Sequence, residues 1–311
     1  MNQVGAGRDR DCSVFRTVDA VGDAWSWLIL REAIFDRVCR FEDFRARLAI
    51  ARSTLSGRLE QLTSAGLFER HSSPAIGVEY RLAPPGEDFL GCLMTAMRWG
   101  DHWAGTDADP PVRAVHRECG QVMTAVLACS RCGGRLEARE VGFDSRPEPV
   151  TCSSGAGARQ RAPGLELLER VRPCSIARTL QVVGDRWSAL IIQECFFGAH
   201  RFDDFARQLS IAPNILSQRL NRLVEHAVLT RTPYQDNPVR HEYRLTASGF
   251  DLYPVPLAML TWGDRWLSHG RPPVVLTHLA CDHQFTAQLV CSACAGPLGN
   301  ADIDLTPRRH P

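Results

Sequence analysis

The sequence contains no lysine, and all 36 of its basic residues are arginine; they oppose 35 acidic residues, so the formal net charge is only +1. A strong field over the whole molecule is therefore excluded, and any surface for nucleic acid must be a local patch. No run of about 18 apolar residues is present to span a bilayer, and the first twelve residues lack the apolar segment of a signal peptide. We therefore expect a cytoplasmic protein without membrane contact.

Sequence signatures of catalysis are also missing. The chain has no glycine-rich phosphate loop, no nucleophile elbow and no metal-ligand set with an open coordination position, so we expect no enzymatic activity. Its 311 residues, 44% of them hydrophobic, suffice for two domains with their own cores. For its twelve cysteines, metal ligation or thiol chemistry is the first interpretation in a reducing compartment.

The chain is a tandem duplication. Residues 12–35 (CSVFRTVDAVGDAWSWLILREAIF) match residues 174–197 (CSIARTLQVVGDRWSALIIQECFF) at 13 of 24 positions, with an offset of 162. The match continues through RFEDF over RFDDF, TLSGRL over ILSQRL, EYRL over EYRL and WGDHW over WGDRW. Between the copies, residues 143–171 are rich in Gly, Ala, Ser and Pro and lack apolar periodicity, which predicts a flexible linker.

The apolar spacing in each copy predicts four helices, two short strands and a further helix. Leu55, Leu59 and Leu62 mark the buried face of the fourth helix, and Gly66 is a suitable helix stop. In the second copy the corresponding leucines are Leu216, Leu220 and Leu223. Three helices followed by a hairpin describe a winged helix-turn-helix, so the predicted fold class is α+β and mostly α.

Six motifs recur in the same order in both copies: an N-terminal cysteine, VGDxW, RFxDF, LSxRLxxL, EYRL and a closing WGD. Over about 95 residues of each copy they resemble the HxlR-type branch of the MarR-like winged-helix transcriptional regulators. The resemblance implies a bacterial regulator that dimerises through its terminal helices and places two recognition helices in successive major grooves. This chain departs from the family by carrying two domains, which is similar to a covalent pseudo-dimer, and by having serine where members usually have proline after the cysteine.

In a winged helix the fourth helix is the recognition helix, and its polar face carries the base readers because the leucines occupy the core. Arginine suits guanine, and Asn or Gln suits adenine, through bidentate hydrogen bonds. The predicted readers are Arg52, Ser53, Thr54, Ser56 and Arg58 in the first copy and Asn214, Ser217, Gln218, Arg219 and Asn221 in the second. We therefore expect the copies to prefer different half-sites. An ordinary solvated face is the alternative, and Arg58 and Arg219 also have the positions of internal ion-pair partners.

Arginines around the recognition helix and the wing predict phosphate contacts. Residues 40–81 contain seven arginines and five acidic residues, and residues 201–244 contain the same numbers. Affinity through such contacts falls steeply as salt rises. The predicted phosphate-contacting residues are Arg40, Arg70, Arg81, Arg201, Arg231 and Arg244. For each of them singly, a solvated surface position is the alternative.

Each copy ends in four soft or borderline metal ligands. The two sets are His116, Cys119, Cys129 and Cys132, and His278, Cys281, Cys291 and Cys294. Four such side chains suit tetrahedral zinc and leave no position for water, so the predicted role is structural. The nine residues between the pairs are expected to form a hairpin, giving one zinc ion per copy in a zinc-ribbon-like extension. The alternatives are a disulfide in each Cys-x-x-Cys or cysteines buried as small hydrophobes.

Two further groups of side chains admit more than one interpretation. Cys12 and Cys174 each begin a first helix, where the helix-terminal amides favour a reactive thiolate, and in the resembled family this cysteine serves some members as an oxidant sensor. Burial as a small apolar residue is the alternative. The aromatic residues Trp25, Trp99, Trp103, Trp187, Trp262 and Trp266 lie on apolar helical stripes and are predicted to be core and dimer-seam residues, or else to line a small-molecule pocket.

The predicted domain order is a winged helix-turn-helix domain at 11–104, a Cys/His extension at 105–142, the linker at 143–171, a second winged domain at 172–267 and a second extension at 268–311. The predicted function is a nucleoid-associated, sequence-specific transcriptional regulator that acts as a monomeric pseudo-dimer on an imperfect inverted repeat of double-stranded DNA. A thiol or a small-molecule effector is the expected signal. The alternative is a metal-binding protein-interaction module that has lost DNA binding, and salt-dependent DNA binding would separate the two.

Overall fold

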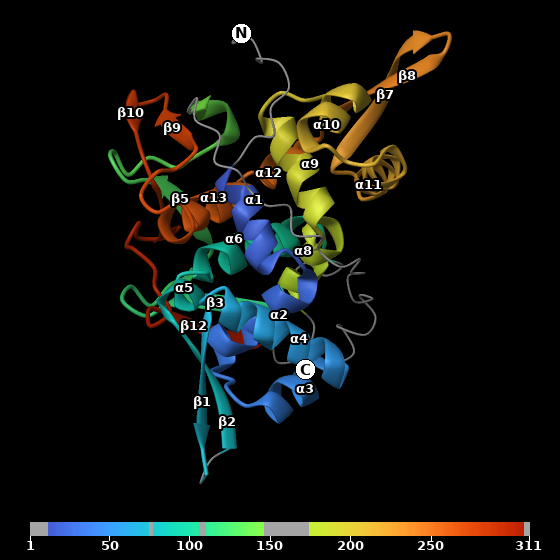
Figure 1. Cartoon of the computed structure of the whole chain (residues 1–311). Helices are drawn as coiled ribbons and strands as arrows, with labels where there is room; N and C mark the ends of the chain where they lie inside the picture. Colours follow the sequence, from blue (N-terminus) through green and yellow to red (C-terminus); the bar gives the residue numbers. More distant parts are fainter. Residues whose placement is uncertain (1–11, 75–76, 106–109, 146–173, 308–311) are drawn as a thin grey trace.

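The computed structural model of the chain describes residues 12–74, 77–105, 110–145 and 174–307 (Figure 1). Most of the predicted linker, from residue 146 on, lies outside these ranges, whereas residues 143–145 belong to a strand. Within the described residues, no helix is both long and apolar enough to cross a membrane. We refer to residues 12–145 as repeat 1 and to residues 174–307 as repeat 2.

Each repeat contains the predicted winged helix-turn-helix. Repeat 1 runs α1 (Ser13–Val21), α2 (Ala24–Asp36), α3 (Phe41–Leu48), α4 (Arg52–Ser64), β1 (Phe68–Ser73), β2 (Gly77–Leu82), the short α5 (Pro84–Glu87) and α6 (Leu90–Trp103). Repeat 2 follows with α8 (Ser175–Val183), α9 (Arg186–Phe196), α10 (Phe202–Leu209), α11 (Pro213–Glu225), β7 (Leu229–Asp236), β8 (Val239–Leu245), α12 (Ala247–Asp251) and α13 (Pro254–Trp266). The antiparallel pairs β1–β2 and β7–β8 are the two wings.

Local sequence explains where the helices begin and end. The aspartate of each VGD motif is an N-cap: Asp23 accepts backbone hydrogen bonds at the start of α2, and Asp185 does the same for α9. The predicted leucine face of α4 is fully buried, with Leu55, Leu59 and Leu62 at 0% exposure. After α4, Gly66 has a φ of 77°, the left-handed conformation that glycine adopts without steric cost, which confirms the predicted stop.

The two repeats pack on each other through their terminal helices. Helix α1 lies against α13 of the other repeat, and α6 lies against α8, so the contact is reciprocal. The glycines of the two WGD motifs permit this close approach, because a Cβ on Gly100 would lie 2.1 Å from the Ser175 carbonyl oxygen and one on Gly263 would lie 2.4 Å from that of Ser13. We call this contact the seam; its buried residues belong to one continuous hydrophobic core that extends through both repeats.

Polar groups at the seam are paired across the repeats. The hydroxyl of Ser13 donates to Asp264 at 2.5 Å, and that of Ser175 donates to Asp101. The serine after each helix-starting cysteine thus binds the aspartate of the opposite WGD motif. The indoles follow the same pattern, since Trp99 Nε1 donates to the Ser248 carbonyl and Trp262 Nε1 to that of Pro85, both at 2.8 Å. These contacts place two of the predicted tryptophans at the seam.

After the winged domains the chain forms short strands that are exchanged between the repeats. Repeat 1 contributes β3 (Val112–His116), β4 (Val122–Met123), β5 (Ala125–Cys129) and β6 (Val141–Ser145), and repeat 2 contributes β9 (Val274–His278), β10 (His283–Gln284), β11 (Ala287–Cys291) and β12 (Ile303–Pro307). Strand β5 pairs with β11, β6 with β9, and β12 with β3, all antiparallel. The predicted extensions are therefore one interlocked unit rather than two separate hairpins.

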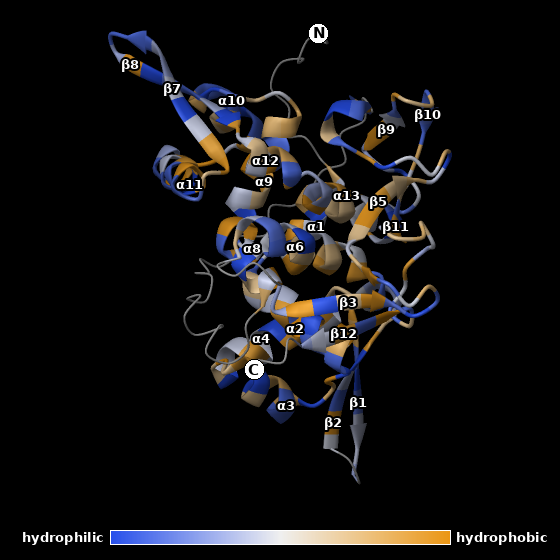
Figure 2. Ribbon diagram, turned by 180° about the vertical axis from the view of Figure 1, so that it is seen from behind, coloured by the Kyte–Doolittle hydropathy of each residue, from blue (hydrophilic) through white to orange (hydrophobic). Residues whose placement is uncertain are grey.

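The recognition helices and the exchanged strands occupy opposite sides of the molecule. In Figures 1 and 2, α4 and α11 lie along one side, the wings point outward at the two ends, and strands β3, β5, β9 and β12 lie along the other side. Figure 2 also shows hydrophobic residues gathered in the central helices and in β3 and β5, whereas the outer part of the β7–β8 wing is largely hydrophilic. This arrangement separates a polar face from the metal-ligand residues.

Candidate nucleic-acid interface and metal centres

The predicted base-reading residues lie mostly on the solvent side of α4 and α11. On α4, Arg52, Ser53 and Ser56 are exposed and Thr54 is half-buried. The Arg52 side chain is 71% exposed, and its Nη1 lies 3.2 Å from Glu42 Oε1 on α3. On α11 the exposed residues are Asn214, Ser217, Gln218 and Asn221. Both polar faces are thus open to solvent, and their roles as base readers stay predictions.

Arg58 and Arg219 do not share this exposed position, and both have the internal ion-pair partners that were the alternative to base reading. Arg58 Nε lies 3.0 Å from Asp23 Oδ2, and its side chain is only 11% exposed. Arg219 Nε lies 2.8 Å from Asp185 Oδ1, with a side-chain exposure of 25%. Each arginine therefore joins the recognition helix to the aspartate that caps the second helix of the same repeat. Both ion pairs thus connect the recognition helix to the second helix of its own domain.

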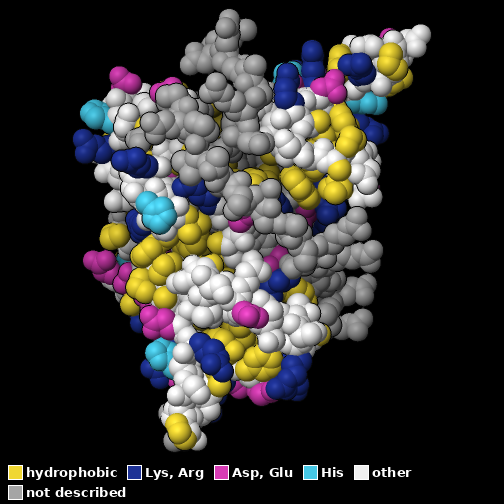
Figure 3. Space-filling model, in the orientation of Figure 1, with side chains coloured by type: hydrophobic (Ala, Val, Ile, Leu, Met, Phe, Trp, Pro, Cys, Tyr) yellow, Lys and Arg dark blue, Asp and Glu magenta, His cyan; other side chains and the backbone are white. Residues whose placement is uncertain are grey.

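The six predicted phosphate-contacting arginines are all exposed. Several are oriented by neighbours: Arg81 and Arg244 lie 2.8 and 2.9 Å from Glu79 and Glu242, two residues earlier on the same strands. Arg201 stacks over the Tyr234 ring in the wing, 4.5 Å from its centroid. In Figure 3, basic side chains gather near the wing at each end of this face. Partial pairing with carboxylates leaves these guanidinium groups accessible, so phosphate binding stays a prediction for them.

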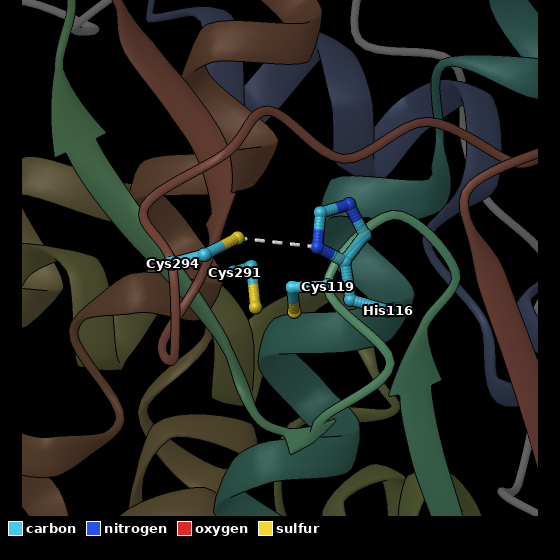
Figure 4. A group of neighbouring side chains, drawn as sticks. All are labelled: His116, Cys119, Cys291 and Cys294. Carbon is cyan, nitrogen blue, oxygen red and sulfur yellow. Dashed lines mark hydrogen bonds between the residues drawn. The ribbon is translucent and has the colours of Figure 1, made fainter.

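The eight predicted metal ligands form two clusters, but their grouping differs from the prediction. One cluster joins His116 and Cys119 of repeat 1 to Cys291 and Cys294 of repeat 2; the other joins Cys129 and Cys132 to His278 and Cys281. In each cluster the ligand atoms all lie within 4.8 Å of one another. Figure 4 shows the four side chains of the first cluster close together, with Cys294 and His116 facing each other. The expectation of one complete site per copy is therefore wrong.

Strand pairing explains the exchange. The β3–β4 hairpin holds His116 and Cys119, but β5 then runs in the extended conformation, which moves the chain roughly 13 Å over its four steps. Cys129, at its end, is paired with Ala287 of β11, and Cys291 is paired with Ala125. Each Cys-x-x-Cys turn therefore reaches the His-x-x-Cys turn of the other repeat. Hairpin strands are present in the extension, because β4 pairs with β3 of its own repeat, but β5 continues the same nine-residue segment and pairs with β11 of the other repeat.

The distances within the clusters suit a tetrahedral ion. A zinc–sulfur distance of about 2.3 Å implies sulfurs about 3.8 Å apart. Cys129 Sγ and Cys281 Sγ are 4.0 Å apart, and His278 Nδ1 lies 3.3 Å from Cys132 Sγ and 3.6 Å from Cys281 Sγ. In the first cluster, His116 Nδ1 lies 3.3 Å from Cys294 Sγ. Three thiols and one imidazole in this geometry can hold one zinc ion per cluster.

The surroundings of the clusters support the same interpretation. The amide N–H groups of Arg131 and Ala293 point to the sulfurs of Cys129 and Cys291 at 3.4 and 3.3 Å, which favours negative charge on sulfur. Each imidazole uses Nδ1 toward the sulfurs, and its buried Nε2 has no hydrogen-bond partner. The nearest carboxylate oxygens, of Glu118 and Glu140, lie 3.9 and 4.0 Å from these nitrogens.

Two glycines that sequence reasoning missed leave room for the imidazoles. A Cβ on Gly134 would lie 3.2 Å from His278 Cε1, and one on Gly296 would lie 3.2 Å from His116 Cε1. Their position two residues after each Cys-x-x-Cys is the sequence signal for them. The eleven cysteines that the structure describes form no disulfide, so the thiols of both clusters are free to bind metal.

The two helix-starting cysteines are both buried, at 3% exposure for Cys12 and 8% for Cys174. Burial raises the pKa of the Cys12 thiol to about 11, although Gln193 Nε2 and the Phe15 amide donate to its sulfur. That pKa opposes the predicted sensor role for Cys12. Cys174 instead accepts a hydrogen bond from Arg31, the residue at the position of Gln193 in the other repeat.

Arg31 is a buried cation that sequence reasoning missed. Burial lowers its pKa, but Cys174 and Glu32 more than compensate and hold the pKa of the guanidinium above its ordinary value. Glu32, which is 1% exposed, pairs with Arg31 and also with Arg47. The sequence signal for these ion pairs is the pair of charged residues, Arg31 and Glu32, in the middle of the largely apolar helix α2.

Comparison with known proteins agrees with this architecture. The family model described as HxlR-like helix-turn-helix matches residues 20–108 and 182–271. An HTH-type transcriptional regulator of Mycobacterium tuberculosis is 42% identical over 143 residues, covering 46% of this chain and 90% of the relative. One from Synechocystis is 34% identical over 95 residues, covering 30% of this chain and 70% of the relative.

Among solved structures, the redox regulator HypR in its reduced form is 33% identical and covers 28% of this chain and 87% of that chain, with a TM-score of 0.27. The curated relatives are described as transcriptional regulators rather than enzymes. The family match falls on both repeats and covers more than half of the chain. This chain therefore belongs to the HxlR-like helix-turn-helix family, with two tandem copies of the domain.

Proposed function

We propose that this chain is a sequence-specific DNA-binding transcriptional regulator in which one polypeptide reads both halves of an imperfect inverted repeat. The observation that carries the proposal is the placement of α4 and α11 on one side of the molecule, with their polar faces exposed and the wings at opposite ends (Figure 1). Helix-turn-helix dimers place two such helices in successive major grooves. Such a regulator acts in the cytoplasm, on the nucleoid.

The reciprocal seam supports a monomeric pseudo-dimer. Family dimers have identical subunits, whereas here α1 packs on α13 and α6 on α8 within one chain. Paired ions strengthen the arrangement at both ends of the seam: Arg98 lies 2.7 Å from Asp251, and Arg265 lies 2.7 Å from Asp88. One chain therefore supplies both recognition helices, and a second chain is not needed to complete the operator contact.

The two half-sites should differ because the two recognition faces differ. Arg52 on α4 offers a guanine reader, whereas Asn214 and Gln218 on α11 offer adenine readers. A homodimer has two identical recognition helices and therefore prefers two identical half-sites. A pseudo-dimer with two different recognition helices does not. An operator with one guanine-containing and one adenine-containing half-site fits this pair of faces.

The test is genome-wide recovery of DNA bound by the tagged protein, followed by gel shifts on the best site at two salt concentrations. We expect one chain per operator by light scattering, and an affinity that falls steeply with salt. Two chains per operator would contradict the pseudo-dimer. Absence of enrichment together with absence of salt-sensitive binding would instead favour the metal-binding interaction module that has lost DNA binding.

The cofactor that we propose is zinc in a structural role. Three sulfur ligands and one imidazole at tetrahedral separations suit zinc, and the protein fills all four positions, which leaves none for a reacting water. Two ions per chain are expected, as in the sequence-based prediction, but each is shared between the repeats. Metal analysis of the purified protein tests this stoichiometry.

The signal that controls the regulator belongs to the same proposal. A thiol response would start from Cys174, which has the cationic neighbour Arg31, rather than from Cys12, which has the neutral neighbour Gln193. A small-molecule effector would find room in a groove of about 360 Å³ between β5 and α12, lined by Arg98, Arg139 and Phe250. Substitution of Cys174 by serine separates the two signals, because it removes only the thiol response.

A further inference from the structure

We propose that the two metal ions are cross-links between the repeats that hold the recognition helices at operator spacing, so that DNA affinity is set by metal occupancy. The inference rests on the proposed DNA-binding function for its consequence, but the cross-linking itself does not. It goes beyond a structural zinc site in each extension, because it assigns the ions a role in the geometry of a distant surface.

Each centre takes half of its ligands from either repeat. His116 and Cys119 lie more than 170 positions from Cys291 and Cys294 in the sequence, and the second centre joins residues about 150 positions apart. Binding of an ion therefore closes a long loop of the chain, which is the arrangement in which a cross-link restricts the unfolded or opened chain most strongly. Loss of an ion removes two coordinate bonds to each repeat, and with them this link between the repeats.

The ligand side chains differ in burial: His116, His278, Cys129 and Cys291 are at most 1% exposed, whereas Cys132 and Cys294 are exposed. Backbone hydrogen bonds from Ser130 to Thr286 and from Ser292 to Thr124 also join each Cys-x-x-Cys turn to the other repeat. Each centre brings three thiols together around an imidazole Nδ1. Coordination of an ion by these atoms therefore adds its binding free energy to a contact that strand pairing between the repeats has already formed.

The exchanged strands transmit this constraint to the seam. Strands β5 and β11 pair with each other next to the centres, and both pack on α13, while β5 also packs on α6. Helices α6 and α13 in turn contact α8 and α1. The centres lie on the side of the molecule away from α4 and α11, so the ions act on DNA binding through the seam and not by direct contact (Figures 1 and 2).

Helix α1 completes the route in repeat 1. Gln61, on α4, donates to the carbonyl oxygens of Asp19 and Ala20 on α1, at 3.3 and 3.2 Å. In repeat 2 the corresponding contact is from Arg222 on α11 to the carbonyl of Gln181 on α8. Each recognition helix is thus attached to a helix that belongs to the seam, so a change at the seam changes the separation of the two recognition helices.

A pair of double variants with identical chemistry tests the cross-linking directly. Cys119→Ser with Cys291→Ser removes two ligands from one centre and none from the other, so we expect one zinc ion per chain. Cys119→Ser with Cys129→Ser removes one ligand from each centre, so we expect loss of both ions. If each ion were bound within one repeat, the first variant would lose both ions and the second would retain one. That result would overturn the proposal. Cys39→Ser, outside both centres, is the control that retains two ions.

The second measurement follows the consequence for DNA. A site is selected from random DNA with the metal-loaded protein, and affinity is then measured after chelation and after return of zinc. We expect chelation to weaken binding at least about tenfold, with recovery on adding zinc, and to increase the radius of gyration in solution scattering. Equal affinity and equal dimensions of the metal-free and metal-loaded protein would overturn the proposal.

These measurements distinguish a failure of the proposed DNA-binding function from a failure of the proposed metal cross-links. Metal-loaded protein that selects no DNA, while the double variants still show the expected zinc stoichiometry, would contradict the proposed function and leave the cross-links in place. Selected DNA whose binding is indifferent to chelation would contradict the metal inference and leave the function in place. Absence of bound zinc in the unmodified protein would overturn the inference without any DNA measurement.

Discussion

The two repeats agree closely where they touch each other and differ where they face solvent. At the seam, Gly100 and Gly263 make the same close approach, and Ser13 and Ser175 donate to equivalent aspartates. On the recognition helices, by contrast, Arg52, Ser53 and Gly57 of repeat 1 are replaced by Pro213, Asn214 and Gln218 of repeat 2. The seam must satisfy both repeats at once, so its residues are constrained as pairs, whereas each recognition face has to suit only one half of a site.

One buried position at the seam differs between the repeats. Arg31 of repeat 1 contacts Cys174, but the equivalent Gln193 of repeat 2 contacts Cys12, so the two seam cysteines have a charged and a neutral neighbour. The wings differ as well, with eight and seven residues in β7 and β8 against six in each of β1 and β2. A duplicated chain thus permits an asymmetry that a homodimer of identical subunits does not.

The largest expected effect comes from breaking the shared seam. We expect Gly100→Ala to reduce the free energy of unfolding by about 3 kcal/mol, because its Cβ would lie 2.1 Å from the Ser175 carbonyl oxygen and the helices must separate. Gly91→Ala, on the same helix α6 but with no atom within 4 Å of the added Cβ, is the control and should stabilise by about 0.5–1 kcal/mol. Urea unfolding measures both. Equal effects would show that the close approach is not required.

Helix α4 has both an ion-paired arginine, Arg58, and an exposed one, Arg52, which allows their roles to be separated. We expect Arg58→Ala to cost about 2 kcal/mol of stability, since it leaves the nearly buried Asp23 without its cation. Arg52→Ala removes a side chain that is 71% exposed and should change stability by less than about 0.5 kcal/mol. Thermal unfolding of the two variants measures the contrast. A smaller loss of stability for Arg58→Ala than for Arg52→Ala would contradict the structural role assigned to Arg58.

The environment of Cys12 predicts a pH dependence of stability. The Cys12 thiol has a pKa of about 11 in the folded protein against an ordinary value of 9.0, so the unfolded chain loses this proton at a lower pH than the folded one. The contribution of Cys12 is therefore complete below pH 9 and is lost between pH 9 and 11, by about 2 kcal/mol. Unfolding of Cys12→Ala and of the unmodified protein at both pH values measures the difference. If the free energy of unfolding changed equally with pH in the variant and the unmodified protein, burial of the Cys12 thiol would be contradicted.

The smallest effects are expected at the recognition faces. Arg52→Ala should weaken binding to one half-site, and Asn214→Ala to the other, each by about 1–2 kcal/mol, because each removes one base-reading contact. Gel shifts on operators with one half-site randomised measure the two separately. Arg58→Ala, corrected for its stability, should leave the half-site preference unchanged. Equal losses on both half-sites for Arg52 and Asn214 would contradict the assignment of one face to each half-site.

Much of the winged domains was predictable from the sequence because their signals are local. Leucine spacing marked the buried face of α4, Gly66 marked its end, and the repeated motifs gave the order of helices and wing. For Arg58 the sequence left an internal ion pair open as the alternative to base reading, but a helix face alone does not show that the partner is Asp23, 35 positions earlier. The same limit applies to Arg31, whose partner Cys174 belongs to the other repeat.

The sequence by itself determined the duplication, the winged helix-turn-helix order and the eight histidine and cysteine residues of the two clusters, since residue type and spacing carry those features. Only the tertiary structure decided which of these eight residues lie together. Two nearly identical copies offer identical local patterns, so pairing within a copy and pairing between copies look the same in sequence. The choice depends on β5 pairing with β11 and on the glycines that let the seam helices meet, and these are contacts between distant parts of the chain.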